Sequence, residues 1–281
     1  ATVNGATVDA RTTQGALNVT TGESALGQVA VLAGTGSITL DTQVDGENVT
    51  LDATNVDAFN SIVTVNGLSD VAITGLAADL DASGLSDGTL DVTLVDNQDD
   101  DAITVTTGEM STSVSGSDAS DTLTVNAELL AMGEDLTLSG AADTFVTAEN
   151  GVGIYASATT GALDVELVAN SSADALILQS GTGSLTLTLN EDSDSVTIDS
   201  LVDDTGQIVL VGAAEEVTVT SLDATLDASA LVGDLVVVTE DDGSAETIAI
   251  ELSAGTNTIT GADDLDTINI NAAALLASGT V

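Results

Sequence analysis

The chain repeats one short run after about half its length. It reads Leu80-Asp81-Ala82-Ser83-Gly84-Leu85 and then, 146 residues later (226 − 80), Leu226-Asp227-Ala228-Ser229-Ala230-Leu231. A longer match relates Gly116–Ala127 to Gly261–Ala272 with an offset of 145 residues (261 − 116). Separate matches that share nearly the same offset indicate tandem copies. We therefore divide the chain into a first super-repeat over residues 1–146 and a second over residues 147–281, which is truncated at its end.

Between these landmarks, short runs alternate apolar residues with Thr or Asp. Examples are Val49-Thr50-Leu51, Leu90-Asp91-Val92-Thr93-Leu94, Ile103-Thr104-Val105 and Leu123-Thr124-Val125. This period of two, with abundant Val, Ile and Thr, is typical of β-strands that bury one face. The centres of the runs lie about ten residues apart, and Gly, Asp, Asn and Ser fill the gaps as turn residues. The sequence predicts an all-β protein built of short strands.

Two architectures accommodate many short strands at regular spacing: a parallel β-solenoid, like a β-helix or β-roll, and tandem β-sandwich domains. The chain has no Pro and no Trp, and its aromatic residues are Phe59, Phe145 and Tyr155. The core must therefore be built from small aliphatic side chains, which favours stacked coils. A coil of two or three strands would take roughly 20–30 residues, so the chain would make roughly 9–14 coils. We predict the solenoid, with tandem sandwiches as the alternative.

A solenoid also predicts which side chains form the core. Alternate residues of successive strands should stack into aliphatic columns, with Thr104 and Thr124 facing outward. Leu80 and Leu226 should occupy equivalent buried positions in the two copies. The other residues expected inside are Ile103, Val105, Leu123 and Val125.

The charge of the chain excludes several classes of function. The sequence has 46 acidic residues and one basic residue, Arg11, and it has no His and no Cys, so its formal charge is −45. Without basic residues the chain cannot neutralise phosphates, which excludes nucleic-acid and anionic-membrane binding. Thiol chemistry and imidazole-based catalysis are excluded as well. Its apolar runs are too short for direct membrane insertion, yet a hydrophobic content of 43% predicts a folded chain.

The carboxylates cluster in the turns between the predicted strands. Hard oxygen ligands in loops, without nitrogen or sulfur donors, favour calcium among biological metals. So many uncompensated charges also repel each other unless cations bind, although each single cluster can equally be a solvated turn. The candidate Ca²⁺ ligands are Asp99, Asp100, Asp101, Asp118, Asp121, Asp241, Asp242, Asp263, Asp264 and Asp266.

Two of these turns carry a family resemblance. Gly116-Ser117-Asp118-Ala119-Ser120-Asp121-Thr122-Leu123 and Gly261-Ala262-Asp263-Asp264-Leu265-Asp266-Thr267-Ile268 resemble degenerate haemolysin-type (RTX) calcium-binding repeats. The resemblance implies a parallel β-roll in which Asp121 and Asp266 are the family's calcium-binding aspartates, with Asp118 and Asp263 as further ligands. The Leu-Asp-Ala-Ser unit beside such turns is similar to long stretches of bacterial S-layer proteins and giant repetitive surface adhesins.

These observations favour a non-enzymatic structural protein. We expect an extracellular, cell-surface component of an S-layer or filament that is stabilised by calcium and associates with itself into a lattice or filament. One alternative is the stalk region of a large repetitive adhesin, which would remain single. The other alternative is a polysaccharide-degrading enzyme on a β-helix, because two suitably separated carboxylates are sufficient for a glycosidase.

Overall fold

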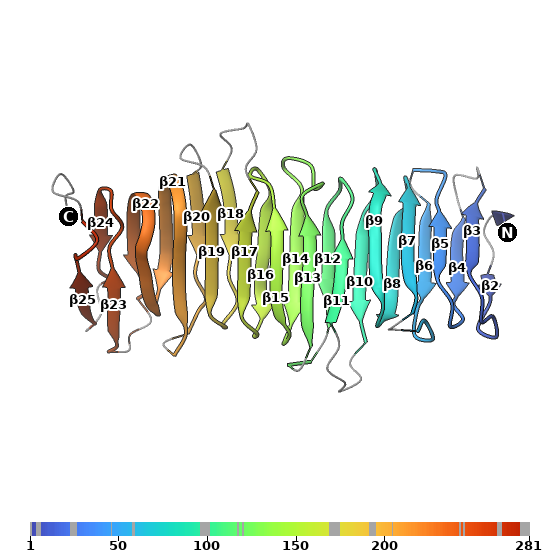
Figure 1. Cartoon of the computed structure of the whole chain (residues 1–281), viewed down its shortest axis with the longest axis horizontal. Helices are drawn as coiled ribbons and strands as arrows, with labels where there is room; N and C mark the ends of the chain where they lie inside the picture. The colour runs from blue at the N-terminus through green and yellow to red at the C-terminus, as the bar shows by residue number, and fades with distance from the viewer. Residues whose placement is uncertain are drawn as a thin grey trace. The chain divides into compact units, whose positions relative to one another are not determined.

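The computed structural model describes most of the chain. Its described residues are 2–3, 7–22, 27–45, 47–57, 60–95, 102–116, 118–119, 121–168, 175–190, 195–203, 205–241, 243, 245–262 and 266–275. The chain forms two compact units, Ala1–Asp143 and Thr144–Val281. In Figure 1, unit 1 runs from blue to green and unit 2 continues to red.

Unit 1 consists of parallel strands in two columns. The odd-numbered strands from β1 to β13 pair with one another, and the even-numbered strands from β2 to β14 do the same. The strands are β1 (Thr2–Val3), β2 (Thr7–Asp9), β3 (Leu17–Thr21), β4 (Gln28–Leu32), β5 (Ile38–Asp41), β6 (Asn48–Asp52), β7 (Ile62–Gly67), β8 (Asp70–Leu76), β9 (Asp79–Leu85), β10 (Leu90–Leu94), β11 (Ala102–Thr106), β12 (Thr112–Ser115), β13 (Thr122–Ala127) and β14 (Asp135–Gly140). Each coil is one odd and one even strand. The predicted parallel β-solenoid is confirmed, and tandem sandwiches, whose sheets are antiparallel, are wrong.

Unit 2 has the same two-column arrangement of parallel strands. Its strands are β15 (Asp143–Ala148), β16 (Gly153–Thr159), β17 (Leu163–Leu167), β18 (Ala175–Gln179), β19 (Leu185–Asn190), β20 (Ser195–Asp199), β21 (Gln207–Leu222), β22 (Thr225–Thr239), β23 (Thr247–Glu251), β24 (Asn257–Thr260) and β25 (Thr267–Asn271). Within each unit, strands of one column lie side by side (Figure 1).

Two strands of unit 2 are longer than the sequence predicts. Strand β21 has 16 residues and β22 has 15, and each passes from one column into the other. The corner of β21 contains Gly212 with φ of 103°, and that of β22 contains Gly233 with φ of 146°. A Cβ atom at Gly212 would collide with the carbonyl oxygen of Leu189 in the preceding coil. Glycine therefore lets the backbone turn the corner without a loop.

The coils differ in length but keep their inner residues in register. One turn of the solenoid leads from Ile38 to its partner Val63, and the next leads from Val63 to its partner Leu80 over a visibly shorter stretch of chain. In unit 2, the turn from Ile208 to its partner Leu226 is similarly short. The loops absorb these differences because only the strands must stack. Leu80 and Leu226 are both fully buried.

The core of each unit is aliphatic. The predicted burial of Ile103, Val105, Leu123 and Val125 is confirmed, and Thr104 and Thr124 lie on the outer face, partly exposed. Burying each Val, Leu or Ile side chain contributes roughly 1.5–3 kcal/mol, and a coil adds several of them to each column.

The Leu-Asp-Ala-Ser unit lies within a strand and bends it. Strand β9 continues through Asp81, Ala82 and Ser83, and its register with β7 shifts there. The Asp81 carboxylate accepts hydrogen bonds from the backbone N–H and the hydroxyl of Ser83 at 3.0 and 2.6 Å, and Asp227 binds Ser229 in the same way. Ala82 is fully buried. The unit therefore combines a small side chain in the core with an outward-facing Asp and Ser that bond to each other.

Candidate functional site

The predicted ligands Asp118 and Asp121 lie in one turn between β12 and β13. The Asp121 carboxylate accepts the backbone N–H of Asp118 at 3.1 Å, and the Asp121 N–H donates to the Asp118 carbonyl at 3.3 Å. Asp121 is only 3% exposed. The structure therefore brings these two residues together and uses the Asp121 carboxylate to close the turn.

Asp266 has a different hydrogen-bond partner, although it matches Asp121 in the repeat. Its carboxylate accepts the backbone N–H of Glu246 at 3.0 Å, and the N–H of Thr267 donates to the Glu246 carbonyl at 2.9 Å. Because Glu246 precedes β23 and Asp266 precedes β25, the carboxylate connects one coil to the next. In both copies the matched aspartate accepts a backbone N–H group.

The other candidate ligands fall into two groups. Asp241 is described and exposed, after the end of β22. Outside the described residues lie Asp99, Asp100, Asp101, Asp242, Asp263 and Asp264. Within the described part of the chain, no three Asp or Glu residues are placed to hold a metal ion. Calcium binding by these turns therefore stays a prediction.

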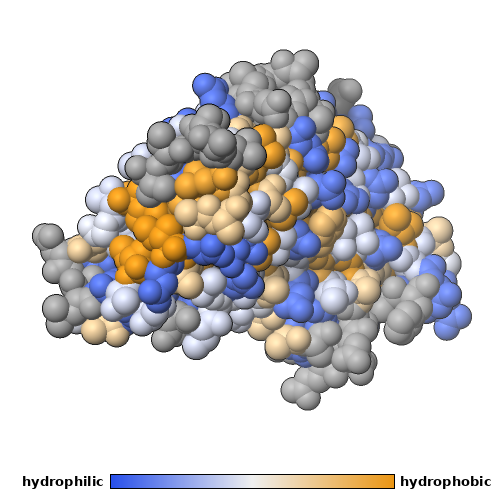
Figure 2. All heavy atoms as spheres, turned by 60° about the vertical axis from the view of Figure 1, so that its left-hand side comes forward, coloured by the Kyte–Doolittle hydropathy of each residue, from blue (hydrophilic) through white to orange (hydrophobic). Residues whose placement is uncertain are grey.

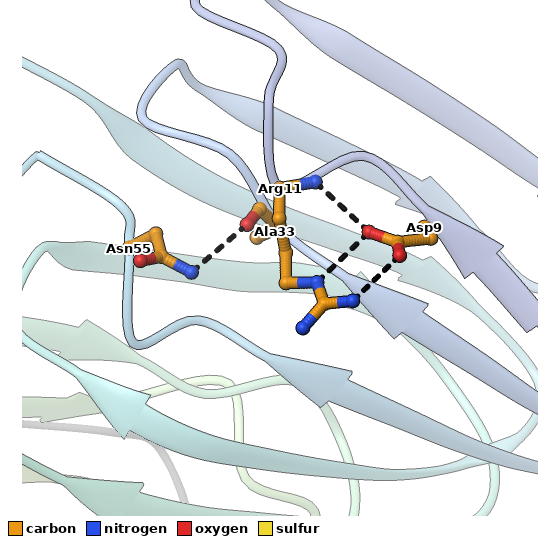
Figure 3. A network of polar contacts seen from close by, with 4 residues as sticks. All are labelled: Asp9, Arg11, Ala33 and Asn55. Carbon is orange, nitrogen blue, oxygen red and sulfur yellow. Dashed lines mark hydrogen bonds and ion pairs between the residues drawn. The ribbon is translucent and has the colours of Figure 1, made fainter.

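Arg11 is engaged by a carboxylate close to it in sequence. Its guanidinium forms an ion pair with Asp9, with Nη2 at 2.7 Å and Nε at 3.0 Å from the two carboxylate oxygens, and its backbone N–H adds a third bond at 3.3 Å (Figure 3). Beside this ion pair, the side-chain amide of Asn55 donates a hydrogen bond to the Ala33 carbonyl of the preceding coil at 3.4 Å. The hydrogen bonds from Arg11 lower the pKa of Asp9 to about 2. Arg11 thus neutralises Asp9, and the sequence contains no other Lys or Arg.

We expect Arg11→Gln to raise the pKa of Asp9 from about 2 towards its ordinary value of 3.8. The folded-state pKa is depressed, so the pair stabilises the fold above the unfolded pKa and loses this effect as pH falls through the folded value. Both side chains are exposed, so the stability effect is small. A carboxyl ¹³C NMR titration of Asp9 measures the shift, and an unchanged titration would show that Arg11 does not control it.

Two further carboxylates crowd each other on the outer face of β17. The pKa of Asp164 is raised, first by burial and second by the negative charge of Glu166. Asp164 nevertheless keeps solvent contact, so the energetic consequence is modest.

We expect Asp164→Asn to raise the melting temperature slightly at neutral pH. The folded-state pKa of Asp164 lies above its unfolded value, so the folded protein binds more protons and stability falls as pH rises above about 3.8. The substitution removes this penalty at neutral pH and changes little well below the unfolded pKa, where Asp164 is protonated in both states. Melting curves in the two pH ranges check it, with Glu166→Gln as a control that removes only the repulsion. A neutral-pH destabilisation by Asp164→Asn would contradict the expectation.

The outer face of the even column in unit 1 is hollowed at two adjoining places. One hollow of about 230 Å³ lies over β4, β6, β8 and β10, and a second of about 300 Å³ continues over β10, β12 and β14. Ala72 stands between Thr50 and Asp91 in the row of paired residues, so a small side chain gives the first hollow its depth. The Asp70 carboxylate accepts the Thr89 hydroxyl at 3.0 Å. The lining offers carboxylates, amides and hydroxyls, which suit a polyhydroxyl ligand.

The exposed surface is not uniformly polar. Figure 2 shows apolar areas between polar ones on the face that it presents. Among the described residues of unit 2, Val232 is 60% exposed and Ile177 is 50% exposed. The described part of the chain contains no helix that is long and apolar enough to cross a membrane.

Comparisons with protein-family models, with curated proteins and with solved structures found no match to this chain.

Proposed function

We propose that the chain is a non-enzymatic structural protein of a cell surface, a component of an S-layer or extracellular filament that is stabilised by calcium. The observation that carries this proposal is the in-register stacking of parallel coils within each unit, with an aliphatic inside and carboxylates outside. Each coil is hydrogen-bonded to its neighbours along both columns, so a unit resists bending and extension. A spacer or lattice element needs this property.

Charge supports a role for calcium in assembly. At a formal charge of −45, copies of the chain repel each other at low ionic strength. Carboxylate oxygens are the ligands that calcium prefers, and an ion shared between two acidic surfaces turns repulsion into attraction. Acidic turns such as that of Asp241 are exposed and accessible to another molecule.

Electron microscopy and sedimentation of the purified chain test the proposal. We expect lattices or filaments in millimolar calcium, and single particles in chelator or in sodium chloride of matched ionic strength. Particles that remain single in calcium would instead support the stalk of a large repetitive adhesin.

One observation supports a polysaccharide-degrading enzyme as a second candidate: Asp70 and Asp91 line the same hollow from adjacent strands. The two residues lie on neighbouring parallel strands about 4.8 Å apart and are offset by two residues, about 6.6 Å, so their Cα atoms are about 8 Å apart. Carboxyl groups at such a spacing would suit an inverting glycosidase. Release of reducing ends from neutral polysaccharides, absent in Asp70→Asn and Asp91→Asn, would establish this activity. No release by the unmodified chain would dismiss it.

A further inference from the structure

Among the residues that the structure describes, Glu47 is a buried carboxylate without a hydrogen-bond partner. The residue is 1% exposed, and neither oxygen of its carboxylate makes a hydrogen bond. It immediately precedes β6, in the inward-facing series that continues with Val49 and Leu51. Burial of an unpaired charge is among the most unfavourable events in folding, and none of the described residues gives this carboxylate a hydrogen bond.

Glu134 occupies the corresponding place in a later coil of the same column, and there the chain supplies the partner. Glu134 immediately precedes β14, and its Oε2 accepts the N–H of Ser111 at 3.0 Å and its hydroxyl at 2.6 Å. Ser111 lies one coil earlier, before β12. For Glu47, the place equivalent to that of Ser111 is held by Gln28, which pairs with Asn48 from one coil earlier. Gln28 is exposed and makes no hydrogen bond with the Glu47 carboxylate. The column therefore tolerates a carboxylate at this corner, but of these two glutamates only Glu134 is satisfied by a side chain.

The surroundings of Glu47 are rich in oxygen. Glu47 lies between Gly27 of the preceding coil and Ser69 of the following coil, because each of the three immediately precedes one of three residues that pair across these coils. Gly27 has no side chain. On the other side, the fully buried Ser69 donates its hydroxyl to the Val44 carbonyl at 2.8 Å, and the Glu47 N–H donates to the same carbonyl at 3.4 Å. Carbonyl, hydroxyl and carboxylate oxygens are the ligands of hard cations.

We propose that Glu47 binds a hard, oxygen-coordinated metal cation inside this corner of unit 1, with the Val44 carbonyl and the Ser69 hydroxyl as neighbouring oxygens. A cation neutralises the buried charge, which Arg11 cannot do because it is paired with Asp9. One carboxylate balances one monovalent ion, so Na⁺ suits the site by charge. Ca²⁺ suits it if the exposed Asp45 of the same turn adds a second carboxylate. This internal site is independent of the calcium proposed for the acidic turns.

Melting temperatures of the full chain, Glu47→Gln and Glu134→Gln test this proposal. Each protein is melted in tetramethylammonium, sodium, potassium and calcium chlorides at matched ionic strength. Relative to tetramethylammonium, we expect one metal ion to raise the melting temperature of the unmodified chain and of Glu134→Gln by several degrees more than that of Glu47→Gln. Isothermal titration with that ion should show one site fewer in Glu47→Gln, while Asp121→Asn and Asp266→Asn should retain it.

Two results would overturn the proposal. In one, Glu47→Gln keeps the full ion-specific gain and the full number of sites. In the other, Glu47→Gln is more stable than the unmodified chain in every salt and no ion-specific gain occurs, which would mean that Glu47 is buried as the neutral acid. Far-ultraviolet circular dichroism verifies that each variant is folded before either comparison.

Discussion

Leu123→Asp is expected to remove a large part of the stability of unit 1. Leu123 is 4% exposed, and it pairs with the buried Ile103 of β11 on the core-facing side of the odd-numbered strands. The substitution loses about 1.5–3 kcal/mol of apolar burial and places an unpaired charge in the core, which costs at least as much again. We expect a loss of at least about 3 kcal/mol, against a total stability of roughly 5–15 kcal/mol for a typical domain.

Thr124→Asp is the matched control for this substitution. Thr124 is the next residue of β13, pairs with Thr104, and lies partly exposed on the outer face. The same charge there should change stability by less than about 1 kcal/mol. Urea unfolding followed by circular dichroism compares the two variants. Equal losses, or a loss below about 1 kcal/mol for Leu123→Asp, would show that β13 does not contribute its alternate residues to the core.

Calcium is expected to raise the melting temperature beyond what matched sodium chloride does. An ion that binds only the folded state at a hundred times its dissociation constant adds about 2.7 kcal/mol. Asp121→Asn and Asp266→Asn should lose part of this gain. Both carboxylates also accept backbone N–H groups, and Asn keeps an acceptor oxygen. Their cost in chelator should therefore be only that of a weakened hydrogen bond, about 0.5–1.5 kcal/mol.

The chelator series separates the two roles of these aspartates. A loss that is the same with and without calcium would assign Asp121 and Asp266 to turn closure alone. Equal melting temperatures of the unmodified chain in calcium and in matched sodium chloride would assign the acidic turns to a screened surface, and the calcium proposal would then be abandoned. The solenoid itself would be unaffected by this result.

The strands and the core could be predicted because their signals are local. An alternating run such as Leu123-Thr124-Val125 has one buried face whichever strand lies next to it, and Gly, Asp, Asn and Ser mark most of the gaps between strands. The coil length could be predicted only roughly, because the coil that leads from Val63 to Leu80 is shorter than the expected range. The length of β21 was missed because Gly212 is equally compatible with a loop and with a continuous bent strand.

The candidate site could be predicted less well because its partners come from other coils. Asp121 and Asp266 occupy matching positions in two similar motifs, yet one accepts an N–H group of its own turn and the other that of Glu246 in the preceding coil. The isolation of Glu47 likewise depends on the absence of a serine like Ser111 one coil earlier. The sequence shows which residues each coil contains, but the contacts between coils depend on the stacking register.

The ion pair of Asp9 and Arg11 has a consequence for digestion of the protein. Proteases that cleave after lysine or arginine have a single possible site in the 281 residues, the bond that follows Arg11. There the guanidinium that such an enzyme must bind is already held by two hydrogen bonds to Asp9. Cleavage at this bond would leave residues 12–281 joined to one another. All the coils from β3 onwards would survive as one uncut fragment in a trypsin-rich environment.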